Sequence, residues 1–166
     1  MPETTIATHG AAIQTADRIA AAKMLQELVV DLTDLSLQGK QAHWNLYGPA
    51  FRELHLLLDD LVDSARAEAD TMAERCLALG APADARLATL SANTHLDPFP
   101  EGRVEDRKVV ELIVSRLETI SATGRRHLDQ LGKVDLASQD LVITLLEGVE
   151  KYLWMFDAHR VPQARR

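Results

Sequence analysis

The stretch "QGKQAHWNLYGPAFRELHLLLDDLVDSARAEADTMAER", residues 38–75, places two histidines and three acids on sequence that is helical in pattern on both sides of Gly48-Pro49. His55 and Asp59 are four residues apart, and so are Asp70 and Glu74, so each pair shares a helix face. The eleven-residue step from Asp59 to Asp70 returns that face to within about 20° but moves it about 16 Å along the axis. The two pairs therefore point the same way, and they cannot hold one metal ion within a single chain.

The composition predicts one all-α domain over residues 1–166, with 1–14 as a flexible N-terminal tail and 160–166 as a short C-terminal tail. Hydrophobic residues make up 46% of the chain and charged residues 26%, which is ordinary for a globular protein, while 4% aromatic content and only eight Gly favour helices over sheet. The formal charge of −7 makes cations more natural ligands than nucleic acid.

The cellular location can be predicted from what the sequence lacks. Cys76 is the lone cysteine and has no partner for an internal disulfide, and the first residues carry neither the basic start nor the apolar run of a signal peptide. No apolar run is long enough to cross a bilayer. We expect a cytoplasmic protein without a membrane partner, and association with the nucleoid stays open as an alternative.

Apolar residues at helical spacing predict four long helices, over residues 15–48, 50–79, 103–131 and from about 138 onward, with Thr15 as the first N-cap and Gly132 as the third C-cap. Residues 80–102, with three prolines and no clean period, predict a long crossover that can include a short helix. This order favours a ferritin-like four-helix bundle with its long crossover between helices two and three. The residues expected in its core are Ile19, Met24, Leu28, Leu32, Leu35, Phe51, Leu54, Leu58, Leu61, Ala65, Ala69, Met72, Cys76, Val109, Leu112, Ile113, Leu117, Ile120, Leu128, Leu141, Leu145, Val149, Leu153 and Phe156.

A metal site inside one chain is disfavoured, because such bundles usually draw Glu-x-x-His pairs from facing helices and this sequence contains none. If residues 50–79 of two copies pack antiparallel about a two-fold axis, His55 and Asp59 of one copy meet Asp70 and Glu74 of the other, and symmetry makes two equivalent sites. The turn at Gly48-Pro49 returns His43 to the same place. Imidazole and carboxylate suit Fe, Zn or Mn, and the residues alone do not choose among them.

Four segments carry a resemblance to a known family: "KQAHWN" (40–45), "LHLLLDDLVD" (54–63), "DTMAER" (70–75) and "SQDLVITLLEGVEKYLW" (138–154). Together they resemble the Dps family, the mini-ferritins called DNA-binding proteins from starved cells. The resemblance implies a hollow homododecamer that acts as a ferroxidase. It would oxidise Fe²⁺ with hydrogen peroxide or dioxygen, store ferric oxide in its cavity and protect against oxidative damage. The implied iron ligands, at two-fold interfaces, are His43, His55 and Asp59 from one subunit with Asp70 and Glu74 from its partner.

Other side chains receive weaker assignments. The resemblance places Trp44 near the iron and suggests that Asp135 and Asp140 line a pore, although capping of a helix start explains Asp140 equally well. Arg66 could form a salt bridge between subunits or lie free on the surface, and Asp63 could support the ligands but is expected, like Asp60, on the surface. Glu147 and Glu150 could nucleate mineral or be merely exposed. We expect Tyr152, Trp154 and Phe156 in the core, and no metal on His9, His95, His127 or His159.

The alternative function is compaction of the nucleoid by DNA binding, with iron chemistry secondary. The first seventeen residues contain no Lys or Arg, whereas the C-terminus carries Arg160, Arg165 and Arg166. We expect DNA binding to be weak on a chain of charge −7.

Deletion of residues 160–166 should abolish whatever DNA binding exists, because these arginines form the basic cluster that neutralises phosphates. A gel shift with linear duplex, at low and near-physiological salt, compares the full-length and truncated proteins. Binding should weaken steeply with salt. Tight binding by both proteins at the higher salt would contradict the expectation and favour the DNA-compacting function.

Overall fold

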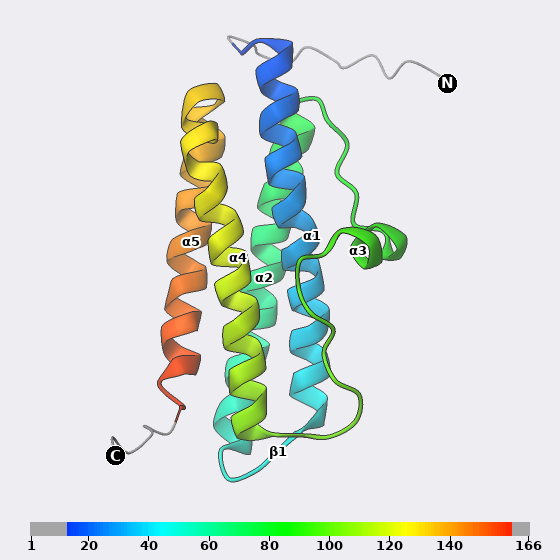
Figure 1. The fold of residues 1–166 in the computed structure, drawn as a ribbon, viewed down its shortest axis with the longest axis vertical. Helices are drawn as coiled ribbons and strands as arrows, with labels where there is room; N and C mark the ends of the chain where they lie inside the picture. Colours follow the sequence, from blue (N-terminus) through cyan, green and yellow to red (C-terminus); the bar gives the residue numbers. More distant parts are fainter. Residues whose placement is uncertain (1–12, 161–166) are drawn as a thin grey trace.

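The computed structural model describes residues 13–160, and it confirms an all-α fold of the ferritin-like type (Figure 1). Four long helices run along one axis, and the crossover with its short helix passes along the outside of the bundle. None of the helices in this part of the chain combines the length and apolar character needed to span a bilayer. The elements in chain order are α1 (Thr15–Asn45), β1 (Leu46–Tyr47), α2 (Phe51–Ala78), α3 (Leu87–Asn93), β2 (Val104–Glu105), α4 (Asp106–Val134) and α5 (Leu136–Asp157).

Helix boundaries differ from the predictions by one to three residues, and side-chain contacts explain part of the difference. Thr15 is the first helical residue, so Gln14 takes the N-cap position. Gly132 lies inside α4, where a Cβ would press on the amide of Gln139, so this glycine permits close packing and does not end the helix. Asp135 starts α5 two residues earlier than expected, because its side chain accepts a hydrogen bond from the Ser138 N–H.

The turn between α1 and α2 is fastened to the start of α4. Gly48 has φ of 140°, and the space that its missing side chain leaves is filled by the carboxylate of Asp106. That carboxylate accepts a hydrogen bond from the Ala50 N–H at 2.8 Å. Next to it, β1 pairs in parallel with β2, Leu46 opposite Val104. The hairpin of α1 and α2 is therefore held at its tip by a buried acid, which fixes how the two helices meet there.

The core runs along the bundle and consists mainly of Leu, Ile and Val, with Phe156 among its fully buried side chains. Most of the predicted core residues are confirmed, but three aromatic or aliphatic residues are exposed. Ile19 lies two positions from the buried Ala21, about 200° around the helix, and Phe51 is the first residue of α2. Trp154 lies away from the face of α5 that packs against the core and is 69% exposed, so the prediction that it is a core residue was wrong. Tyr152 is partly buried and packs against the core.

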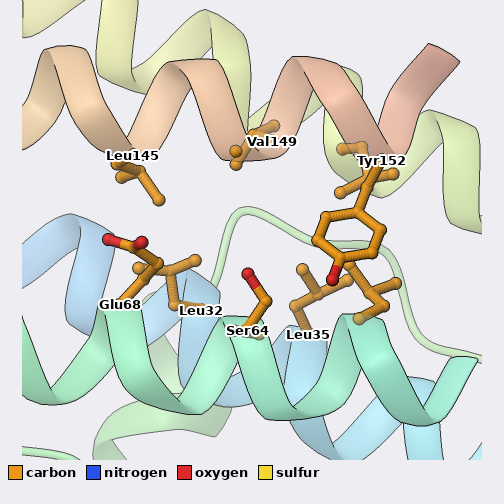
Figure 2. Close-up of a pocket in the computed structure, with 11 residues that line it drawn as sticks. Leu32, Leu35, Ser64, Glu68, Leu145, Val149 and Tyr152 are labelled. Carbon is orange, nitrogen blue, oxygen red and sulfur yellow. The ribbon is translucent and has the colours of Figure 1, made fainter. Parts of the chain in front are cut away.

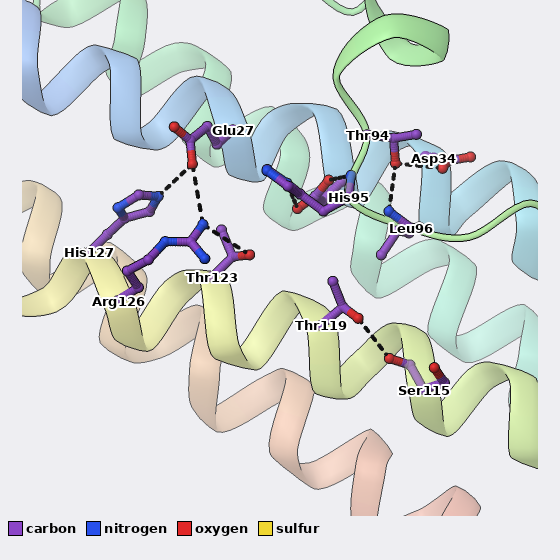
Figure 3. Close-up of polar contacts among 11 residues, drawn as sticks. Glu27, Asp34, Thr94, His95, Leu96, Ser115, Thr119, Thr123, Arg126 and His127 are labelled. Atoms are coloured by element: carbon purple, nitrogen blue, oxygen red, sulfur yellow. Dashed lines mark hydrogen bonds and ion pairs between the residues drawn. The ribbon is translucent and has the colours of Figure 1, made fainter.

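Polar contacts attach the crossover to α1 (Figure 3). Asp31 is fully buried and accepts hydrogen bonds from the backbone N–H and from Nδ1 of His95, both at 2.9 Å. Thr94 donates its hydroxyl to Asp34 at 2.7 Å and accepts from the Leu96 N–H. A second histidine, His127, pairs with Glu27 at 2.9 Å between α4 and α1. His95 and His127 thus each contact a carboxylate of α1.

Arg116 of α4 is the other buried anchor of the crossover, and its side chain is 4% exposed. It donates to the carbonyls of Asp97 and Pro98 at 3.0 and 3.1 Å, and to the side chain of Gln38 at 2.9 Å. Burial lowers the pKa of Arg116, yet these acceptors solvate its charge inside the protein. One guanidinium thus joins α1, α4 and the crossover.

Replacing Arg116 by Met should lower the midpoint of thermal unfolding by about 5 °C, since two crossover carbonyls and Gln38 lose their donor. The matched control is Arg107→Met on the exposed face of the same helix, which should leave the midpoint unchanged. Equal midpoints for both variants would show that the buried guanidinium does not hold the crossover.

Candidate metal centre

Three of the five predicted ligands lie together at the hairpin. Within residues 13–160, His43, His55 and Asp59 are the one group of three His, Cys, Asp or Glu side chains arranged to hold a metal ion, with their ligand atoms within 4.8 Å of one another. His43 comes from the last turn of α1, and the other two come from the first turns of α2. His43 is buried, whereas His55 and Asp59 are half-buried. The group therefore lies at the surface, against the fastened turn.

The two imidazoles hold each other through the main chain. His43 Nδ1 is 2.9 Å from the carbonyl oxygen of His55, and His55 Nδ1 is 3.1 Å from the carbonyl oxygen of His43. Their rings stack with centroids 3.6 Å apart. A carbonyl oxygen only accepts hydrogen bonds, so each Nδ1 must carry the hydrogen. In the neutral rings the lone pair is then on Nε2, the tautomer in which this nitrogen can bind a metal.

The carboxylate of Asp59 has two neighbours from α1. Its Oδ1 is 2.6 Å from Nζ of Lys40 and 3.3 Å from Nδ1 of His43. The hydrogen bond from Lys40 is the main cause that holds the pKa of Asp59 below its usual range. Asp59 is thus an anion at neutral pH, as a metal ligand has to be.

The structure leaves Asp70 and Glu74 outside this group, exposed and later on α2. Because α2 is continuous from Phe51 to Ala78, Asp70 stays about 16 Å and Glu74 about 22 Å along the axis from Asp59, and neither can close on it. One chain therefore presents three of the five predicted ligands at the hairpin and the other two farther along α2.

Figure 2 shows a pocket between the helices in the interior of the bundle. Among the residues that the structure describes, the pocket between the helices is lined by one acid, Glu68, with Ser64, Tyr152 and apolar side chains that include Leu32 and Leu145. Burial raises the pKa of Glu68, and burial also raises that of Tyr152. A single carboxylate in apolar surroundings is too few ligands for a pair of metal ions.

Asp135, which the resemblance suggested for a pore, makes its contacts within the chain, and a pore-lining role stays a prediction. It is buried, and its carboxylate binds Arg75 at 2.6 Å and caps α5 through Ser138. Both contacts occupy the carboxylate inside the chain. Asp140 by contrast is exposed in the first turns of α5.

The remaining predicted side chains that lie within residues 13–160 are on the surface. Trp44 is 69% exposed, and its ring centroid is 5.9 Å from Nζ of Lys40. Glu150 forms an ion pair with Arg125. Arg160 pairs with Asp157 at 3.0 Å, whereas His9, Arg165 and Arg166 lie outside the described residues. The other exposed residues of this set are Asp60, Asp63, Arg66, Glu147 and His159.

The sequence analysis missed Lys40 and the carbonyl partners of the imidazoles. The helical spacing of Lys40 and His43, three residues apart, could have indicated a shared face. The carbonyl contacts depend on how closely α1 and α2 approach at the turn, which residue spacing does not specify.

Comparisons with known proteins agree with this fold. A family model described as "Ferritin-like domain" matches residues 22–161. The DNA protection during starvation protein of Agrobacterium fabrum is 31% identical over 137 residues, which cover 82% of this chain and 85% of that protein. The DNA protection during starvation protein 2 of Deinococcus radiodurans is 34% identical over 92% of this chain, but the match spans 63% of the relative's length.

Among solved structures, Dps from Microbacterium arborescens in its high iron form superposes with a TM-score of 0.83 at 38% identity. The match covers 86% of this chain and 93% of that one. Both the helix arrangement and the sequence are therefore shared along nearly the whole bundle. The chain belongs to the ferritin-like domain family and, within it, to the Dps proteins.

Proposed function

We propose that this chain is a Dps-type ferroxidase and iron-storage protein that oxidises Fe²⁺ at sites shared between two subunits. The observation that carries the proposal is the half-site at the hairpin, where His43, His55 and Asp59 each offer a ligand atom and these atoms lie within 4.8 Å of one another. Membership in the Dps proteins supports iron as the metal, and the relative from Microbacterium arborescens was solved in a high iron form.

The missing ligands come from a second copy. Antiparallel packing of α2 against α2 about a two-fold axis places Asp70 and Glu74 of the partner beside the half-site, and it repeats the site at the other end. Their exposure on α2 leaves them available for such a contact. Relatives with Dps structures support an oligomeric assembly, and we propose the homododecamer for this chain.

The donor set suits iron that arrives as Fe²⁺ and leaves as Fe³⁺. Carboxylate oxygens are hard ligands that stabilise Fe³⁺ more than Fe²⁺, while the imidazoles hold the ion without filling its coordination sphere. Two Fe²⁺ ions supply the two electrons that cleave the O–O bond of one hydrogen peroxide, so no hydroxyl radical is released. Together with two water molecules, this reaction gives two ferric oxyhydroxide units and four protons. The cavity stores the oxyhydroxide, and the solvent takes up the protons.

Fe²⁺ oxidation should depend on the half-site. In an anaerobic Fe²⁺ titration followed by added peroxide, the double variant His43→Ala, His55→Ala should oxidise iron at least about tenfold more slowly than the wild type, because both nitrogen ligands are gone. The control is His159→Ala at an exposed position outside the ligand group, with wild-type rates expected. Size-exclusion chromatography should show both variants assembled, since core burial does not involve these ligands. Unchanged oxidation by the assembled double variant would refute the site.

Sharing of the site predicts complementation between two inactive variants. Mixed assemblies of the His43→Ala, His55→Ala variant with an Asp70→Ala, Glu74→Ala variant should recover part of the oxidation rate, because a hybrid two-fold contact contains one complete ligand set. Each variant alone, dissociated and reassembled in the same way, is the control. Verified hybrids as inactive as their parents would show that the acids of α2 do not complete the half-site.

A further inference from the structure

His55 lies between two other rings at the half-site. Its ring centroid is 3.6 Å from that of His43, with 23° between the planes, and 5.0 Å from that of Phe51, with 26° between the planes. Both neighbours are stacked on the imidazole, which is too small to hold two rings side by side on one face. His43 and Phe51 therefore cover opposite faces of His55, and the three rings form one stack.

Backbone contacts fix the two ends of this stack. His43 is buried in the last turn of α1. Phe51 is the first residue of α2, and its N–H donates to the carbonyl of Gly48 at 3.2 Å in the fastened turn. Phe51 and His55 are four residues apart, so their side chains leave α2 on the same face. The helix itself thus holds the ring of Phe51 over His55.

The hydrogen bond of His55 leaves part of its orientation free. Its Nδ1 is 3.1 Å from the carbonyl oxygen of His43, which fixes one ring atom. The torsion that turns an imidazole about its Cβ–Cγ bond has broad minima, so one such contact permits the ring plane to tilt. Rings stacked on both faces restrict that tilt. The 5.0 Å between the centroids of Phe51 and His55 is a distance at which stacked aromatic pairs attract each other.

The exposure of Phe51 fits a role at the site better than a role in the core. Phe51 is 44% exposed, whereas Leu54 and Leu58, which face the core on the next turns of α2, are 1% and 0% exposed. A phenyl ring that stays partly in water contributes less to the packing of the bundle than a buried one. Loss of this ring should therefore change the site more than the stability of the fold.

We propose that Phe51 is a positioning residue for the metal site, which holds the imidazole of His55 in the orientation that binds the ion. The inference rests on the proposed function and adds to it an apolar residue that carries no ligand atom. The ring of Phe51 restricts His55 before the ion arrives, so binding costs less side-chain freedom and the affinity of the site is higher.

The test is a titration of the assembled, metal-free protein with Co²⁺, which accepts imidazole and carboxylate ligands and has a visible absorption spectrum that depends on their geometry. The signal of this site is the part that the His43→Ala, His55→Ala variant loses. Phe51→Leu keeps an apolar side chain without the flat ring. It should bind Co²⁺ about fivefold more weakly and with an altered spectrum.

Two further variants separate the ring from its bulk and from its place. Phe51→Tyr keeps the ring and should retain the wild-type affinity and spectrum. Phe99→Leu makes the same exchange at a partly buried position of the crossover and is the matched control, with no change expected. Size-exclusion chromatography checks that each variant is assembled.

The outcomes that overturn the role of Phe51 differ from those that overturn the metal site. Wild-type affinity and spectrum in Phe51→Leu, or a Phe51→Tyr variant as weak as Phe51→Leu, would overturn the positioning role and leave the metal site standing. Loss of assembly by Phe51→Leu would assign the ring to the contact between subunits and overturn the role as well. Absence of Co²⁺ binding by the wild type would overturn the metal site, and the role of Phe51 with it.

Discussion

A continuous α-helix keeps its residues at fixed axial distances, and this constraint governs the candidate site. Helix α2 extends without interruption from Phe51 to Ala78, so Asp59 and Asp70 remain about 16 Å apart whatever the rest of the chain does. Two ligand pairs on one face of such a helix become one site only when another helix with the same pairs lies beside it. The requirement for a partner thus follows from helix geometry before any interface is considered.

The second determinant is the fastened tip of the α1–α2 hairpin. Asp106 fills the space beside Gly48 and binds the Ala50 N–H, which ties the turn to the start of α4. With the turn held, the last residues of α1 pass close enough to the start of α2 for His43 and His55 to exchange hydrogen bonds with each other's carbonyl groups. Backbone packing therefore selects the tautomer of both imidazoles, and no acid is needed as their orienting partner.

Much of this arrangement could be predicted from residue spacing, because helical periodicity and the positions of glycine and proline are local properties. The four long helices, the crossover and the convergence of His43 with His55 and Asp59 all follow from them. The burial of individual residues was harder to predict from the sequence, because it depends on which neighbours cover a helix face. The exposed Trp154 is an example. The contacts of Lys40 and Asp135 depend on pairing across helices, which spacing along one helix does not reveal.

The structure separates the residues that stabilise the bundle from those that present chemistry. Buried charges far from the hairpin are fully engaged, Asp31 by His95 and Arg116 by Gln38 and two crossover carbonyls, so they hold the fold and offer nothing to a ligand. At the hairpin the opposite holds. His43, His55 and Asp59 each offer a ligand atom there, and the closest contact of Asp59 is with the ammonium of Lys40 on α1. The contacts that hold the bundle together are therefore separate from the side chains that would bind a metal ion.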